Sequence, residues 1–155
     1  MFDEAMFVSA ENLEDRLKGV IHDDTQQKGI AYHLTVDSVY TLARGQIDFG
    51  GSERQDSSSS PVEPEKQNSG DDYGWWKLGR GFYHISYNES IELQEKELGM
   101  IAPLPRILAS GTTHQTLLFA AGKEPTANLL LVGNQGIDIK ENARVSQLSI
   151  WRQTS

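Results

Sequence analysis

The stretch "GIAYHLTVDSVYTL", residues 29–42, alternates apolar and polar side chains as a half-buried β-strand does. Its predicted apolar face comprises Ile30, Tyr32, Leu34 and Val36. The opposite face carries Ala31, His33, Thr35 and Asp37. A titratable imidazole therefore stands between two small residues on the polar face. It is either a solvated side chain or the mark of a pocket.

The residues before this strand predict a short helix. "SAENLEDRLKGVI", residues 9–21, has Ser9 as a plausible N-cap, acidic residues in its first turns and Gly19 as a stop. Its buried stripe would comprise Leu13, Leu17 and Val20 or Ile21. We therefore expect a short N-terminal amphipathic helix ahead of the first long strand.

Residues 52–71 form a segment rich in serine and proline, with six serines, two prolines and almost nothing apolar. Such a stretch buries too little surface to offset the entropy of ordering it. We expect a flexible loop here. It interrupts a single domain that spans residues 1–155, because neither flank is large enough for a domain of its own.

Beyond this loop the chain reads as short β-strands separated by turns. "ANLLLVGNQGIDIKENARVSQLSIWR", residues 127–152, is the clearest case and has the pattern of a β-hairpin with turns at "GNQG" and "KEN". Many short strands at this spacing favour a mostly β domain, either a barrel or a sandwich.

Composition excludes several classes of function. The 155 residues carry a net charge of −8, whereas a general nucleic-acid binder needs a basic stripe. No cysteine is present, so there is no thiolate metal site, and the four scattered histidines lack the spacing of a zinc site. No apolar run reaches the ~20 residues of a membrane span, and the acidic N-terminus is not a secretory signal. We expect a soluble cytoplasmic protein with no membrane or nucleic-acid partner.

Several segments, in order, resemble one family. They are "GIAYHLTVDSVYTL" (29–42), "GFYHISYNESIEL" (81–93), "PRILASG" (105–111) and "LLLVGNQGIDIKENARVSQLSIWR" (129–152). Together they resemble the dCTP deaminase and dUTPase superfamily over about residues 28–152. The resemblance implies a distorted β-barrel of the β-clip type. It also implies a homotrimer with nucleotide sites between its subunits.

The resemblance further implies an enzyme, a deoxynucleotide triphosphate hydrolase that deaminates dCTP, releases pyrophosphate from dUTP, or does both. Mg²⁺ would come with the triphosphate, and no zinc is expected. The alternative is a non-catalytic trimeric β-clip protein that binds a nucleotide or a protein partner without turnover. Two departures from the family motifs favour it. The position of the first-motif Asp is taken by His33, and the place of the nucleoside motif reads "AAGKEPT" (120–126). In addition, the Arg-Ser-Ser stretch reads Leu104, Pro105, Arg106, so the usual Arg–Ser pair is not in register.

Two residues are candidates for catalysis by this resemblance. His33 occupies the slot of the first-motif Asp, where it could contact phosphate or act as a base near neutral pH. Glu124 falls near the position of the deaminase Glu that activates water. The plain alternatives are a solvated strand histidine and an exposed turn glutamate.

A second set of residues is expected to bind the nucleotide: Arg106, Ser110, Gly111, Thr113 and Gln147. A guanidinium offers planar donors to phosphate. A turn of small residues offers backbone N–H groups and hydroxyls. The resemblance places Gln147 of "RVSQL" toward the nucleotide or the trimer axis. Surface exposure, ordinary turn chemistry and a strand-edge position would explain the same residues without a ligand.

Overall fold

The computed structural model describes residues 5–154, and the chain over this range is mostly β-structure. The strands are β1 (Ala5–Val8), β2 (Leu17–Lys18), β3 (Gln27–Lys28), β4 (Ala31–Leu42), β5 (Ser59–Pro61), β6 (Trp75–Leu78), β7 (Gly81–Tyr87), β8 (Ser90–Ile91), β9 (Glu97–Pro103), β10 (Thr112–His114), β11 (Leu117–Ala120), β12 (Ala127–Val132), β13 (Ile137–Lys140) and β14 (Arg144–Gln153). The helices are α1 (Asp23–Gln26) and α2 (Pro105–Leu108), with 3₁₀ turns at Ala10–Asn12 and Glu14–Arg16.

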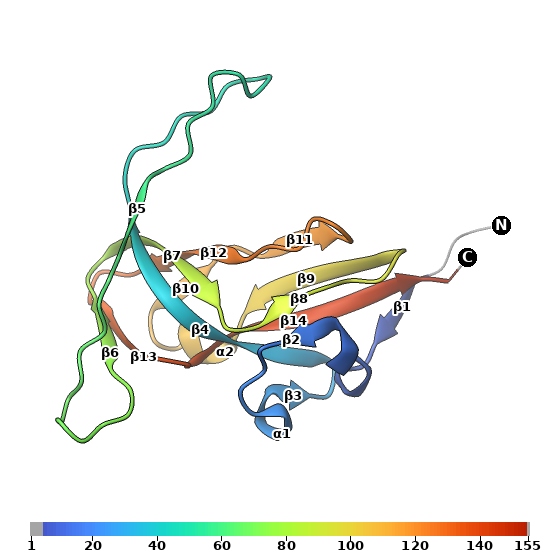
Figure 1. Cartoon of the computed structure of the whole chain (residues 1–155), viewed down its shortest axis with the longest axis horizontal. Coiled ribbons are helices and arrows are strands. Elements are labelled where there is room, and N and C mark those ends of the chain that lie inside the picture. The colour runs from blue at the N-terminus through green and yellow to red at the C-terminus, as the bar shows by residue number, and fades with distance from the viewer. Residues whose placement is uncertain (1–4, 155) are drawn as a thin grey trace.

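Within the described range, ten strands form one sheet whose main path runs β10-β12-β7-β4-β14-β9-β11. β1 is added to β14, and both β3 and β5 are added to β4. All these pairs are antiparallel, and the sheet curls into a half-barrel (Figure 1). β6 pairs with β13, and β2 pairs with β8, as separate ribbons. The predicted mostly β, barrel-like fold of the β-clip type is confirmed.

The alternation of the opening strand predicts the core well at its start. Tyr32, Leu34 and Val36 are fully buried in β4. Ile30 is 69% exposed, so that part of the prediction was wrong; the residue precedes the strand and follows the turn at Gly29. A register shift between Val36 and Ser38, where β4 pairs with β7, moves the next buried position to Val39. Such a bulge reverses the parity of the strand.

The predicted N-terminal amphipathic helix is wrong in type. Residues 10–16 form two consecutive 3₁₀ turns and then enter β2. Ser9 stands at the N-cap position, but its side chain caps no backbone N–H group. Leu13 and Leu17 are buried as expected. Tertiary contacts override the helical pattern, because Leu17 pairs with Ile91 of β8 and the side chain of Arg16 turns into the protein.

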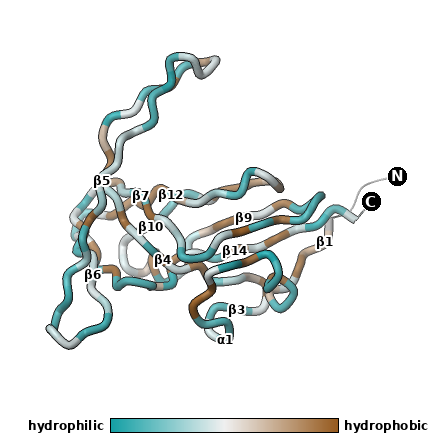
Figure 2. Tube along the Cα trace, viewed as in Figure 1, coloured by the Kyte–Doolittle hydropathy of each residue, from teal (hydrophilic) through white to brown (hydrophobic). Residues whose placement is uncertain are grey.

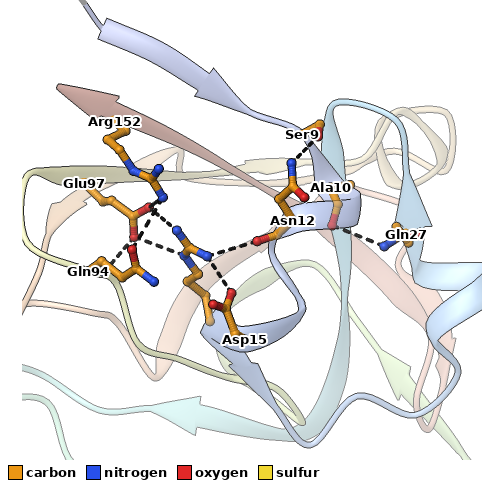
Figure 3. A network of polar contacts seen from close by, with 9 residues as sticks. Ser9, Ala10, Asn12, Asp15, Gln27, Gln94, Glu97 and Arg152 are labelled. Atoms are coloured by element: carbon orange, nitrogen blue, oxygen red, sulfur yellow. Dashed lines mark hydrogen bonds and ion pairs between the residues drawn. The ribbon is translucent and has the colours of Figure 1, made fainter. Parts of the chain in front are cut away.

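A buried ionic network holds these turns against the sheet (Figure 3). The guanidinium of Arg16 donates to both carboxylate oxygens of Glu97, at 3.3 and 2.8 Å, and to the carbonyl oxygen of Asn12. Glu97 also accepts from Arg152 and from the backbone N–H of Gln94. The carboxylate of Glu97 therefore links the N-terminal turns, the start of β9 and the end of β14.

The serine- and proline-rich segment is divided by a strand. β5 pairs with the end of β4, and the residues between these strands form an extended arm with a bridge between Gln46 and Gln55. After β5, the chain forms a second projection, and an isolated bridge between Glu65 and Trp75 joins its two sides. The two projections leave the sheet in opposite directions (Figure 1) and are largely hydrophilic (Figure 2). The flexibility of residues 52–71 stays a prediction.

The predicted C-terminal hairpin is corrected by the structure. β12, β13 and β14 occur where the pattern places strands, but they do not pair with one another; β12 lies between β10 and β7, β13 pairs with β6, and β14 lies between β4 and β9. Gly136, with φ 75°, turns the chain from β12 toward β13. A Cβ atom here would lie 2.6 Å from the carbonyl oxygen of Leu78, so the close approach to β6 requires glycine.

Candidate functional site

A pocket of about 410 Å³ opens beside α2, where β13 leads into β14. Arg106 and Ser110 line it from α2 and the turn that follows, as do Lys140 and Arg144 at the strand ends. Trp75 closes one side from the start of β6. Asp138 and Glu141 also line the pocket, and Glu141 accepts a hydrogen bond from the backbone N–H of Gly74 at 3.0 Å.

Local sequence explains how α2 presents its side chains. Pro105 occupies the start of the helix, where its missing N–H is not needed. Ile107 is buried against the core and anchors the turn, while Arg106 remains exposed at the pocket. Ser110 donates its hydroxyl to the carbonyl oxygen of Arg106 at 2.9 Å. Gly111 then takes a left-handed conformation, with φ 78°, and redirects the chain into β10.

His33 lies next to this pocket, in register with Gln147 across the β4–β14 pair. Its Nδ1 is 3.1 Å from a guanidinium nitrogen of Arg144, which itself lines the pocket. Burial is the main cause that lowers the pKa of His33, and the positive charges of Arg144, Lys28 and Arg106 lower it further. His33 is therefore half-buried, close to three cations and neutral near pH 7.

The cations around His33 lack carboxylate partners. Arg106, Lys140, Arg144 and Lys28 take part in none of the ion pairs within residues 5–154, although the protein carries 22 acidic residues. Lys140 instead lies over the ring of Trp75, at 5.6 Å from its centroid. Clustered, unpaired guanidinium and ammonium groups favour an anion. The local charge of the pocket is thus opposite to that of the whole chain.

Glu124 lies elsewhere in the chain. It follows β11 in a loop, where its carboxylate accepts the backbone N–H of Leu93 at 2.9 Å. That hydrogen bond is the main cause that lowers the pKa of Glu124, so the side chain is ionised at neutral pH. It lines hollows shared with Ser90 and Ile91 and does not line the pocket of Arg106. Within one chain, the structure does not bring the two predicted catalytic residues together.

The predicted nucleotide-binding residues are partly gathered. Arg106 and Ser110 line the pocket, and Gly111 forms the turn directly behind them. Gln147 is half-buried beside His33, and its amide donates to the carbonyl oxygen of Pro103 at 3.3 Å. Thr113 lies further along, on β10, and does not line this pocket.

Sequence reasoning did not assign Trp75, Lys140 and Arg144 to the site, nor the carboxylates Asp138 and Glu141. Arg144 opens the quoted "RVSQL" segment, so its place in the family-like pattern was an available signal. Trp75 and Lys140 become neighbours only because β6 pairs with β13, residue Trp75 opposite Lys140. No local pattern predicts that pairing.

His114, which follows the turn of small residues at 110–113, belongs to a buried hydrogen-bonded cluster inside the sheet. His114 is 5% exposed, and its Nε2 is 2.7 Å from the hydroxyl of Ser146. That hydroxyl also contacts the hydroxyl of Tyr87 at 2.7 Å, while Asn128 joins the same cluster. Burial lowers the pKa of His114. The cluster satisfies polar groups inside the sheet and is not open to a ligand.

Among residues 5–154, no group of three or more His, Asp or Glu side chains is arranged to hold a metal ion. The pocket lining combines two carboxylates, Asp138 and Glu141, with the cations Arg106, Lys140 and Arg144, and it contains no such group. In that same range, no helix has the length and apolar character needed to cross a bilayer.

Curated relatives share most of the chain. A probable deoxyuridine 5′-triphosphate nucleotidohydrolase of Methanosarcina barkeri is 30% identical over 138 residues, which cover 87% of this chain and 77% of the relative. Similar matches are the proteins of the same name from Methanosarcina mazei (28% identity, 87% of this chain and 77% of the relative) and Halobacterium salinarum (28%, 96% and 84%). The chain matches no protein-family model.

A solved structure supports the fold. The 2′-deoxycytidine 5′-triphosphate deaminase of Agrobacterium tumefaciens superposes with a TM-score of 0.67 at 13% sequence identity, over 96% of this chain. The chain spans about half of that deaminase, 48% of its length. The chain therefore belongs to the dCTP deaminase and dUTPase superfamily.

Proposed function

We propose that this protein binds a deoxynucleoside triphosphate with its phosphates at Arg106, Lys140 and Arg144, and hydrolyses it. The observation that carries the proposal is the cluster of cations without carboxylate partners, which lines the pocket beside the His33 slot. The names of the curated relatives favour dUTP as the substrate, with release of pyrophosphate. Deamination of dCTP is the second activity to test, because the deaminase shares the fold.

A triphosphate matches the chemistry of the pocket. Its negative oxygens would accept charge-assisted hydrogen bonds from the guanidinium groups of Arg106 and Arg144. The Lys140 ammonium adds a third positive charge on the Trp75 side. Ser110 would add an uncharged donor if its hydroxyl turned from the carbonyl oxygen of Arg106, to which it donates in this structure, toward a phosphate oxygen. Electrostatic attraction of this kind would hold an anionic substrate to a protein whose net charge is −8.

Water activation needs a carboxylate, and we assign it to Glu124 of a neighbouring subunit. The pKa of Glu124 is lowered, so it is ionised and able to take a proton from water. Water would attack the α-phosphorus of dUTP, its proton would pass to Glu124, and the bond to the bridging oxygen would break as pyrophosphate leaves. Because Glu124 does not line the pocket of its own chain, this assignment requires an oligomer.

An exposed apolar face on the sheet supports a homotrimer. Leu98 and Trp151 are paired across β9 and β14 and are 45% and 40% exposed. Trp151 packs edge-on against Phe7 of β1, and Leu118 of β11 is 68% exposed opposite Met100. A patch of this kind on a sheet face favours burial against another copy. We retain the homotrimer expected from the family resemblance.

Mg²⁺ would arrive on the phosphate oxygens of the substrate rather than on a protein ligand set, because the described residues offer no such set. No step of the proposed reaction is routed through it. A cytoplasmic location, with no nucleic-acid or membrane partner, remains the expectation from the sequence.

A product assay with dUTP and dCTP tests the proposal, combined with calorimetric titration of their non-hydrolysable analogues. We expect pyrophosphate and dUMP from dUTP, with loss of turnover in Glu124→Gln and loss of binding in Arg106→Gln. Tight binding without any turnover would instead support the non-catalytic alternative. Two departures from the family motifs favour that alternative: His33 stands at the position of the first-motif Asp, and "AAGKEPT" (120–126) stands in place of the nucleoside motif.

Subunit mixing tests the shared site. If Glu124 acts on the pocket of a neighbour, then Glu124→Gln and Arg106→Gln chains are each inactive alone. Mixed after dissociation in equal amounts, they should regain about a quarter of the wild-type activity, because that fraction of interfaces pairs an intact Arg106 with an intact Glu124. No recovery from refolded, trimeric mixtures would contradict the placement of Glu124.

A further inference from the structure

The contact between Arg144 and His33 fixes which ring nitrogen carries the proton. A guanidinium has only N–H donors and stays charged at all accessible pH values. The Arg144 nitrogen lies 3.1 Å from Nδ1 of His33, so Nδ1 must accept that hydrogen bond. A neutral imidazole that accepts at Nδ1 carries its hydrogen at Nε2. The structure therefore selects one tautomer of His33.

We infer that His33 is a hydrogen-bond donor to a substrate phosphate through Nε2–H, and that Arg144 is the positioning residue that holds it in this state. The inference deepens the proposed function, since the anion it names is the triphosphate of that same pocket. It separates two roles that the sequence leaves open, phosphate contact and general base. It also gives Arg144 a role apart from its own positive charge.

The charged groups that lower the pKa of His33 are three cations. Arg144 comes from β14, Lys28 from β3 and Arg106 from α2. Together with burial, these charges oppose protonation of the ring and lower its pKa. A protonated His33 would also lose the Arg144 hydrogen bond, because both ring nitrogens would then be donors. The neutral Nε2–H form is the one these neighbours stabilise.

The same geometry argues against His33 as the base. To take a proton from water, the ring must offer a free nitrogen lone pair, and its Nδ1 lone pair is occupied by Arg144. A first-motif carboxylate can accept a proton, whereas this imidazole, with Nδ1 occupied by Arg144, can only donate a hydrogen bond through Nε2–H. The substitution of histidine for aspartate at this slot thus replaces a proton acceptor by a hydrogen-bond donor.

Nitrogen-15 NMR of the full chain tests the tautomer directly, without any ligand. We expect the Nε2–H tautomer of His33 at pH 7.5 and a pKa below the ordinary value of about 6.5. Arg144→Met, which removes both donor and charge, should raise that pKa by roughly one unit. Arg144→Lys, which keeps a charged donor, should restore part of the shift. Arg54→Gln, on the projecting arm, is the matched control and should leave His33 unchanged.

Inorganic tripolyphosphate tests the donor role, because it carries the phosphates without a nucleoside. We expect it to shift the His33 Nε2–H resonance. We expect His33→Gln, which retains an amide donor and is no base, to bind it within about threefold of wild type, and His33→Asp to lose at least tenfold. A base role predicts the reverse for turnover, with His33→Gln inactive and His33→Asp active.

The outcomes separate this inference from the proposed function. An Nδ1–H tautomer in the wild type, or an Arg144→Met chain that stays folded with an unchanged His33 pKa, would overturn the role of Arg144. Tripolyphosphate that binds without moving the His33 resonance would overturn the donor role. If the resonance moves as expected but dUTP and dCTP neither bind nor react, the inference stands and the proposed nucleotide activity fails.

Discussion

Nη2 of Arg16 lies 2.8 Å from Oε2 of Glu97, and this ion pair joins residues 81 positions apart. Arg16 is 5% exposed, and the Glu97 side chain is fully buried. Two charges that leave water together depend on each other, since the other ionic partner of each, Asp15 for Arg16 and Arg152 for Glu97, is largely exposed to solvent. The pair thus makes the N-terminal turns part of the folding unit of the sheet.

Glu97→Gln should destabilise the protein by about 3 kcal/mol, because it removes the buried counter-charge of Arg16 and leaves only the exposed carboxylate of Asp15 to pair with it. Urea denaturation followed by circular dichroism measures the change. Asp15→Asn is the matched control, since Asp15 pairs with the same guanidinium but is 66% exposed, and it should cost less than about 1 kcal/mol. Equal losses in the two variants would contradict the importance of burial.

Stability should fall in two steps as the pH is lowered. Burial lowers the pKa values of His33 and His114 in the folded state, so the unfolded chain binds protons first and stability declines as pH drops below about 6.5. Burial alone would raise the pKa of Glu97, but hydrogen bonds from Arg16, Gln94 and Arg152 outweigh it and lower the value.

The Glu97 contribution is therefore complete above about pH 4.5 and is lost as pH falls through its lowered folded-state value. Thermal melts from pH 8 to pH 3 should show both declines. His114→Gln should flatten the first, and Glu97→Gln the second. A first decline that persists unchanged in His114→Gln and His33→Gln would show that other groups cause it.

Loss of single pocket cations should weaken nucleotide binding. Arg106→Gln removes charge-assisted hydrogen bonds worth about 1.5–3 kcal/mol, which corresponds to roughly a 10- to 100-fold increase in Kd for a triphosphate. Trp75 lines the pocket, so quenching of its fluorescence reports binding, and Trp75→Phe should abolish most of that signal. Arg54→Gln should bind as the wild type does. A Kd that is independent of both Arg106 and ionic strength would place the phosphates elsewhere.

Limited proteolysis checks the predicted flexibility of the serine- and proline-rich segment. Trypsin should cut first at Arg54 or Lys66, which lie on the two projections, and leave the rest of the chain folded. Mass spectrometry identifies the first cleavage site. Resistance of both bonds under conditions that cleave elsewhere would show that this segment is held in place.

Sequence patterns predict those features of the fold that depend on local periodicity. Alternation over β4 identifies three core residues, and the order of motif-like segments leads to the fold. The predicted polar face was wrong in part, because Ala31 and Thr35 are buried and His33 is half-buried. The prediction fails where contacts between residues far apart in the sequence determine the local structure. The N-terminal pattern predicts a helix, yet Arg16 forms an ion pair with Glu97 of β9 and Leu17 pairs with Ile91 of β8. The strands of residues 127–152 read as a hairpin, yet each pairs with an earlier strand.

The candidate site shows the same division. Arg106, Ser110 and His33 are prominent in the sequence because each stands in or beside a motif-like segment. Arg144 gains its significance from pairing of β4 with β14, which places it against His33. Trp75 reaches the pocket through the ribbon of β6 and β13. The separation of Glu124 from the pocket also follows from topology and has no local signature.

Calorimetric titration of the wild-type chain with the α,β-imido analogue of dUTP, run beside a pyrophosphate-release assay with dUTP, tests the central claim most directly. The proposed function predicts saturable binding that Arg106→Gln weakens at least tenfold, and turnover that Glu124→Gln abolishes. No binding of the dUTP analogue or of its dCTP counterpart by the folded wild-type chain would contradict it.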